Sequence, residues 1–339
     1  MKNNNRDKKD IQKLIFEEIR KDLPSRFELA RTVSKILKVS TDSVYRRIRG
    51  EKDISLKELI ILCKHFNFSF DRYLQESTNV PSFYYPPLRY STPENYVDYS
   101  QSLLRFLKSI WNIREKEFIM ILSDIPLVHF TRYKELTLFK SFVSSHKMYE
   151  HGSFASYVEY AESMRVMNVL SELAKTYVLI PTTEIWSEST IDPTLRYLKL
   201  YLKAGYFEDV SAALAICNQL TLLVNHLEDW IERGYKNVDP ETSAIKVYLS
   251  DHSFETDLFY LQSGPIKLNC FKLSTFNSLT SSDSVFCEDT EKFIEEQLSD
   301  SVLLNEVSKT DCTHFFNRMR EKISLTIDFI KNFNVKKPV

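Results

Sequence analysis

The side chains with the greatest chemical capacity gather in one short stretch, TDSVYRRIR at residues 41–49. Val44 and Ile48 are four residues apart, so on a helix they share one face, and this spacing predicts that the face packs inward. The opposite face then carries guanidinium, phenol, hydroxyl and carboxylate groups. Arg can donate two hydrogen bonds to the O6 and N7 atoms of a guanine. The pattern therefore predicts a helix over 41–49 that reads the edges of DNA bases.

The polar residues of this stretch and of the loop after it have two expected roles. On the outward face, aimed at bases, are Thr41, Asp42, Tyr45, Arg46 and Arg49. Better placed to contact phosphates, which positions a protein on DNA without reading its sequence, are Ser43, Arg47 on the flank, and Lys52. The Asp42 carboxylate has two interpretations. It accepts a hydrogen bond from cytosine N4, or it stabilises the positive end of its own helix, and we favour the second.

Neighbouring segments are expected to hold this helix in place. Apolar spacing predicts one helix over 11–22 and another over 25–37. The short sequence Lys38-Val39-Ser40 predicts a tight turn directly before the helix at 41–49. A last short helix is expected to end near Gln75. Five helices in residues 1–75, two of them joined by a tight turn, have the layout of a helix-turn-helix.

Local signals mark where these helices begin and end. Ser25 with Glu28, and Ser55 with Glu58, have the three-residue spacing of a capping box, which opens a helix. Gly50 is placed to end the helix that lies between them. These signals predict the boundaries of the second, third and fourth helices independently of the apolar spacing.

Residues 11–75 resemble a lambda-repressor-like (Cro/XRE-type) DNA-binding domain. The matching stretch is KVSTDSVYRRIRGEKDISLKELIILCKHFNFSFDRYL. In that family the first residues of the helix after the turn read the bases. The resemblance implies this role for Thr41, Asp42, Ser43 and Tyr45, with Arg46 next.

Two residues depart from the family pattern. Lys38 stands at a turn position that often holds Gly, and this requires a backbone conformation other than that of glycine or a slightly longer second helix. The inward pair Val44 and Ile48 is four residues apart, where the family more often shows three. A different inward pair would rotate the outward face and change which arginine reaches the bases.

The charge distribution agrees with DNA contact at one end of the chain. The net charge is −1, but residues 1–75 hold 18 Lys and Arg against 11 Asp and Glu, and the remainder holds 27 against 35. A basic head on an acidic body is typical of a protein that contacts nucleic acid through the head alone. The alternative is an ordinary helical bundle whose arginines form a solvated face.

After the head, the chain is expected to be mainly α, and α+β overall. Residues 76–95 hold four prolines and several aromatic residues, which predicts a linker. Residues 96–339 are expected to form a regulatory and dimerisation region, helical over 96–240 and with a small antiparallel sheet plus helices over 241–339. The expected strands, the first of them optional, cover 118–123, 245–250, 257–262 and 266–273. The chain after the head also resembles the C-terminal regions of uncharacterised bacterial regulators with this type of head. The resembling stretches are SDIPLVHF, ELTLFKSF, PTTEIWS and FNSLTSSD, and this resemblance implies no known ligand.

Signals for a second activity are weak. The five glycines are far apart, so neither GxGxxG nor GxxxxGK[ST] occurs, and HExxH and GxSxG are also missing from the sequence. His146, His151 and His252 stand near expected turns, where we interpret them as solvated. Glu184 and Trp186 either line a pocket or belong to a helix cap and a core, and we favour the second. We therefore expect no enzyme activity, metal or cofactor.

The sequence as a whole predicts a bacterial transcription regulator that binds double-stranded DNA. Recognition by such heads uses paired half-sites about 34 Å apart, so a homodimer is expected. The body is expected to dimerise and is available for a small-molecule or protein effector. Five scattered cysteines, no secretory signal and no apolar run of membrane-spanning length predict a cytoplasmic protein without membrane contact. The alternatives are an enzyme body on a DNA-targeting head, and a basic head that binds an acidic protein.

Overall fold

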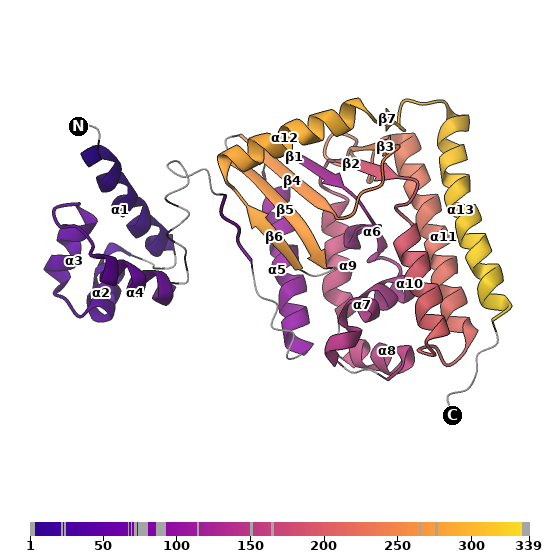
Figure 1. The fold of residues 1–339 in the computed structure, drawn as a ribbon, viewed down its shortest axis with the longest axis horizontal. Helices are drawn as coiled ribbons and strands as arrows, with labels where there is room; N and C mark the ends of the chain where they lie inside the picture. The colour runs from indigo at the N-terminus through magenta and orange to yellow at the C-terminus, as the bar shows by residue number, and fades with distance from the viewer. Residues whose placement is uncertain are drawn as a thin grey trace. The chain divides into compact units, whose positions relative to one another are not determined.

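The computed structural model describes residues 4–333 apart from 22, 24, 67, 69, 71–72, 74–80, 86–92, 114, 150–151, 164–165, 265 and 275–276. The chain divides into two compact units, Met1–Ser82 (unit 1) and Phe83–Val339 (unit 2), each with its own core (Figure 1). The prediction of a mainly helical chain with some β structure is confirmed.

Unit 1 has four described helices around one small core. They are α1 (Asn4–Lys21), α2 (Arg26–Leu37), α3 (Thr41–Ile48) and α4 (Leu56–Phe66). Apolar residues at helical spacing supply the core, and its buried members are Ile15, Phe16, Ile19, Leu29, Ala30, Val33, Val44 and Leu62. The helix expected to end near Gln75 falls largely outside the described residues.

Unit 2 is built on a seven-stranded sheet with the strand order β6-β5-β4-β1-β2-β3-β7. The strands are β1 (Glu117–Ile121), β2 (Thr182–Ser187), β3 (Ile245–Ser250), β4 (Leu258–Ser263), β5 (Ile266–Ser274), β6 (Asn277–Ser281) and β7 (Val302–Leu303). The central pairs β1–β2 and β2–β3 are parallel, and the outer pairs are antiparallel. The prediction of a small antiparallel sheet over 241–339, with 118–123 as an optional strand, is therefore wrong in size and in the direction of the central strands. Four expected strands are confirmed as β1, β3, β4 and β5.

Three strands were not predicted, β2, β6 and β7, and of these β2 lies in the centre of the sheet. All but one of its six residues are buried, so its sequence TTEIWS shows no alternation of apolar and polar residues. Parallel neighbours need long crossover connections, usually helical. These connections are the helices between β1 and β2 and between β2 and β3. They explain why residues 96–240, which were predicted to be helical, also contain the strands β1 and β2.

Helices cover both faces of the sheet (Figure 1). One face packs against α12 (Ser284–Ser299) through Ile119, Ile121, Ile185 and Ile294. The other face meets a layer of helices, which are α5 (Pro93–Trp111), α6 (Leu127–Phe130), α7 (Lys134–Tyr149), α8 (Phe154–Ser163), α9 (Val166–Tyr177), α10 (Asp192–Lys203), α11 (Val210–Arg233) and α13 (Lys309–Lys331).

The described end of the expected linker lies on the edge of the sheet. The backbone N–H of Tyr84 donates to the Thr280 carbonyl at 2.6 Å, and the Thr280 N–H donates to the Tyr84 carbonyl at 3.0 Å. The ring of Phe83 meets that of Phe286 edge-on, with 5.2 Å between centroids. This segment therefore covers part of the otherwise open edge of β6.

Among the described residues, only α11 is long and apolar enough to cross a membrane, judged by length and composition. Of its most apolar window, 39% is buried inside the protein. The buried residues include Leu220, Leu227 and Trp230, which belong to the core of unit 2. A core helix passes the same test of length and composition.

Candidate nucleic-acid interface

A tight turn of three residues joins α2 to α3, as expected. Lys38 ends α2 in the left-handed conformation, with φ 56° and ψ 43°. The Ser34 hydroxyl donates to the Val39 carbonyl at 2.6 Å, which closes the turn. Ser40 then caps α3, because its hydroxyl accepts a hydrogen bond from the Ser43 N–H at 3.2 Å. Both expectations for Lys38 are therefore wrong, because the residue adopts the left-handed conformation that favours glycine and α2 is not lengthened.

Replacing Lys38 with Gly is expected to stabilise unit 1 by up to about 1 kcal/mol, because the left-handed conformation strains any residue with a Cβ atom. The matched control, Arg31→Gly, places glycine in the middle of α2 at an exposed position and should destabilise the unit by about 1 kcal/mol. Hydrogen–deuterium exchange of the α2 amides in the full chain measures both changes. Faster exchange in Lys38→Gly would contradict the prediction.

The inner face of α3 carries Val44 and Ile48, which pack against the core as expected, and also Arg47. Val44 is fully buried and the Arg47 side chain is 3% exposed. The guanidinium donates to Glu58 at 2.6 Å (Nη2 to Oε1) and to the Ser43 carbonyl at 3.0 Å. Glu58 is held in turn by the Ser55 N–H, which donates to it at 2.9 Å in the expected capping box. The expected position of Arg47 on an accessible flank is wrong, because Glu58 draws its side chain under the helix.

The outer face of α3 keeps most of the expected side chains in solvent. Exposed residues are Thr41, Asp42, Arg46, Arg49 and, in the following loop, Lys52, while Ser43 and Tyr45 are half-buried. Tyr45 packs partly against the core, so its ring contributes less to the outer face than expected. Burial of Arg47 leaves Arg46 and Arg49 as the two arginines that face outward.

Glu51 orders these two arginines. Arg49 donates to its carboxylate twice, at 2.6 Å from Nε and 3.0 Å from Nη2, and the Nε of Arg46 lies 3.9 Å from Oε2. The hydrogen bond from Arg49 holds the pKa of the Glu51 carboxyl below its usual value. An anion that approaches this face would compete with Glu51 for both guanidinium groups.

The loop after α3 is fastened to α1 by one residue, Gln12. Its amide nitrogen donates to the carbonyls of Arg47 and Lys52 at 2.7 and 3.0 Å, and its oxygen accepts from the Ile54 N–H at 2.8 Å. From apolar spacing, the sequence predicted only that α1 packs against the other helices, so these hydrogen bonds of Gln12 were not predicted. Gln12 holds Lys52 beside the outer face of α3.

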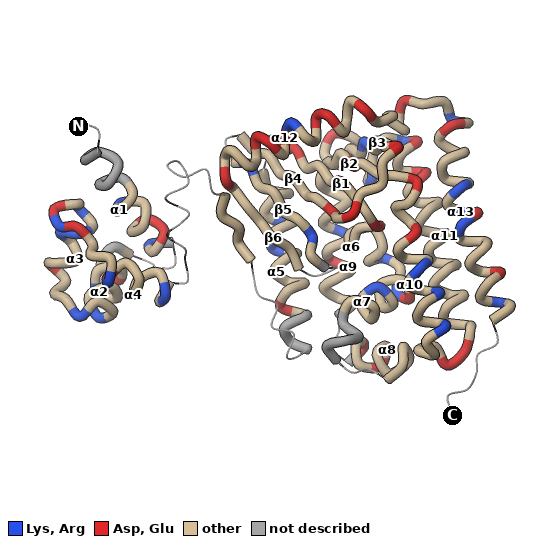
Figure 2. The backbone as a smooth tube through the Cα atoms, in the orientation of Figure 1, with Lys and Arg blue, Asp and Glu red and all other residues tan. Residues whose placement is uncertain are grey.

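Basic residues also occupy the surface of the neighbouring helices. Figure 2 shows Lys and Arg on α2, α3 and α4, and the exposed ones outside α3 are Arg31, Lys35, Lys38, Lys57 and Lys64. Positive charge of this kind attracts a polyanion before any specific contact forms.

Unit 2 contains a buried polar cluster that sequence reasoning did not assemble. Glu184 in β2 is fully buried and accepts hydrogen bonds from His129 at 2.9 Å, from the Trp186 indole at 2.8 Å and from the Tyr177 hydroxyl. Lys236 lies 4.2 Å from the centre of the Tyr177 ring. Trp186 is a core residue, as favoured, but the expected helix cap around it is wrong, because the segment is a strand.

Opposing effects act on the charges of this cluster. Burial alone would raise the pKa of the Glu184 carboxyl, but attraction to His129 and their hydrogen bond lower it to about 2. Burial lowers the pKa of Lys236 to about 7, against the attraction of Glu184. Since these side chains lie in the core, the cluster supports the fold of unit 2 rather than offering a surface for substrate.

The other polar residues singled out from the sequence do not come together. His252 lies exposed in a loop, and the side chains of His146 and His151 fall outside the described residues. In the described part of the chain, no three His, Cys, Asp or Glu side chains form a group that could hold a metal ion.

Comparison of the chain with protein-family models, with curated proteins and with solved structures gives no match.

Proposed function

We propose that this chain is a DNA-binding transcription regulator and that α3 enters the major groove of its operator. The observation that carries the proposal is the division of α3 into a buried face with Val44 and Arg47 and an exposed face with Arg46 and Arg49, directly after a tight turn. A recognition helix needs both faces, because one fixes the helix to its domain and the other contacts bases. The resemblance of residues 11–75 to Cro/XRE-type domains supports the same role.

Within this proposal the residues have distinct roles. Thr41 and Arg46 face outward from the N-terminal turn and the middle of α3, and we assign them to base edges. Arg49 and Lys52 stand at the end of α3 and in the loop that Gln12 holds, and we assign them to phosphates. Asp42 lies in the first turn of α3, where its charge favours the helix whether or not it contacts cytosine.

The proposal extends to assembly and location. One head of this size offers few phosphate contacts, and paired half-sites about 34 Å apart require two heads. A homodimer formed through unit 2, in the cytoplasm, meets this requirement.

Arg46→Ala tests the proposal. In titrations of the full chain against genomic fragments at low salt, the variant is expected to lose about 1–3 kcal/mol of affinity for the selected site and to tolerate more bases at one position. A uniform loss on all sequences would assign Arg46 to a phosphate. The matched control is Arg318→Ala, since Arg318 lies in unit 2, is 43% exposed and pairs with Glu188 as Arg46 pairs with Glu51.

Two results would reject the proposed function. One is negligible binding of the wild-type chain to every fragment at low salt. The other is salt-sensitive binding to an acidic protein without binding to DNA, which would make the basic head a protein-interaction surface.

A further inference from the structure

Unit 2 encloses a cavity of about 370 Å³ between α5 and the sheet. Its apolar wall is formed by side chains of α5, by the strands β1, β4 and β5, and by the segment that leads into α6. These residues include Leu103, Phe106, Phe118, Met120, Phe259 and Leu268. The volume falls within the range of about 300–1,000 Å³ that is usual for pockets that bury small ligands.

One part of the wall is charged. Lys140 of α7, Asp257 before β4 and Lys272 of β5 line the cavity there. The Asp257 side chain is fully buried and accepts from Lys272 at 2.6 Å and from the Ser123 N–H at 2.8 Å. The Lys140 side chain is 8% exposed and is paired with Asp124. Packed side chains therefore hold these charges in place.

The charges of this wall are paired, but one lysine keeps free donors. Of the two ammonium groups that line the cavity, Lys272 is paired with Asp257, and Lys140 is paired with Asp124. In the part of the chain that the structure describes, the Lys272 ammonium makes a single hydrogen bond, to the Asp257 carboxylate, so two of its three N–H groups are available. A ligand carboxylate would accept charge-assisted hydrogen bonds from these free N–H groups of Lys272.

We propose that this cavity binds a mostly apolar small molecule that carries a single carboxylate, with its apolar part against α5 and β1 and its carboxylate at Lys272. This site is separate from the proposed interface for DNA, and its occupancy is measurable without DNA.

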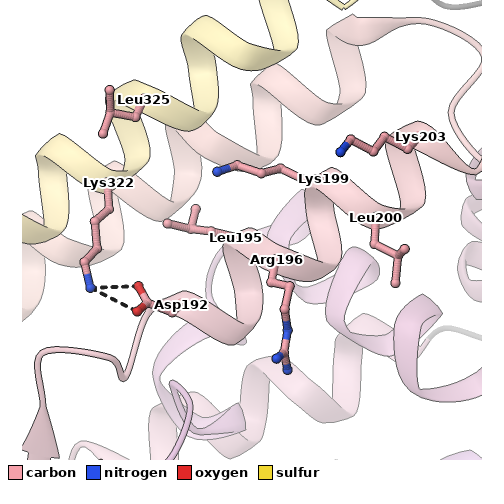
Figure 3. Close-up of a pocket in the computed structure, with 8 residues that line it drawn as sticks. All are labelled: Asp192, Leu195, Arg196, Lys199, Leu200, Lys203, Lys322 and Leu325. Atoms are coloured by element: carbon pink, nitrogen blue, oxygen red, sulfur yellow. Dashed lines mark hydrogen bonds and ion pairs between the residues drawn. The ribbon is translucent and has the colours of Figure 1, made fainter.

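A second hollow, between α10 and α13, does not carry the same inference. It is larger, at about 520 Å³, and is lined by Arg196, Lys199, Lys203 and Lys322 (Figure 3). These are surface side chains, and Lys322 is already paired with Asp192 at 2.8 Å. In Figure 3 the basic side chains extend in different directions and do not converge on one point. The cavity beside α5 differs because its wall is largely apolar and because two of its charged groups, Asp257 and Lys140, are buried.

The test uses the full chain with decanoate and 1-decanol, which share an apolar part and differ in charge. Calorimetric titration is expected to show one decanoate per chain, bound at least about tenfold more tightly than decanol, because a hydrogen bond to a charged group is the stronger kind. Lys272→Met should remove this preference, and Lys246→Met, an exposed lysine on β3, should retain it. Leu103→Trp should weaken both ligands by filling the cavity.

A second measurement needs no variant. Cys270 lines the cavity, whereas Cys63 belongs to unit 1. Decanoate should slow the alkylation of Cys270 by N-ethylmaleimide and leave that of Cys63 unchanged, as followed by peptide mass spectrometry. Equal affinity for decanoate and decanol, or alkylation of Cys270 at the same rate with and without decanoate, would overturn the proposal even if Lys272→Met does not fold. Neither result bears on whether α3 binds DNA.

Discussion

Replacing Glu184 with Gln is expected to destabilise unit 2 by about 3–5 kcal/mol, the usual effect of removing one partner from a buried charged group. In the wild-type chain the carboxylate accepts from His129, Trp186 and Tyr177. The amide keeps the shape of the side chain but turns one acceptor oxygen into a donor. At least one of the three donors then loses its partner in a core that excludes water.

Tryptophan fluorescence during urea unfolding measures this loss. All three tryptophans, Trp111, Trp186 and Trp230, lie in unit 2, so the signal does not include the unfolding of unit 1. The matched control is Glu255→Gln, which makes the same chemical change at an exposed loop position. Equal midpoints for the two variants would show that the cluster around Glu184 contributes little.

The same variant should change the response to acid. The folded-state pKa of Glu184 is lowered from 4.5 to about 2, so its ionisation stabilises the fold above pH 4.5, and this stabilisation is lost as the pH falls from 4.5 to 2. A shift of this size corresponds to about 3 kcal/mol. The difference in unfolding free energy between wild type and Glu184→Gln should therefore shrink over this window, and a constant difference would contradict the assignment.

Sequence reasoning succeeded where the signals are local. The capping residues Ser25, Ser40 and Ser55 each act within three residues, and the turn after α2 needs only its own backbone. Strands β3, β4 and β5 follow one another along the chain and are separated by short connections, so their pattern is visible in sequence.

The rest depends on distant contacts. Glu184 collects partners from positions 129 and 177, and β2 pairs with strands more than 60 residues away in either direction, so no window around it shows the arrangement. Arg47 is a smaller case of the same kind. Its neighbour Arg46 is also an arginine of α3, but it is exposed. Arg47 is buried and pairs with the Glu58 carboxylate, which lies eleven residues further along the chain.

That difference between two adjacent arginines gives the second large effect. Arg47→Met is expected to destabilise unit 1 by about 2–3 kcal/mol, because it removes the charged partner of Glu58 and the hydrogen bonds to Ser43. The value lies below that for Glu184 because the Glu58 side chain is 18% exposed, and water partly compensates it. Hydrogen–deuterium exchange of the α3 and α4 amides in the full chain measures the loss, since tryptophan fluorescence reports only unit 2.

Arg49→Met is the matched control, since it removes an exposed arginine whose partner Glu51 is also exposed. Exchange in α3 and α4 should remain at the wild-type rate in this variant. DNA binding then separates the two roles. In Arg47→Met, affinity should fall only in proportion to the unfolded fraction of unit 1, with the sequence preference of the folded fraction unchanged. A loss of sequence preference in folded Arg47→Met would instead mean that this side chain leaves Glu58 and contacts a base.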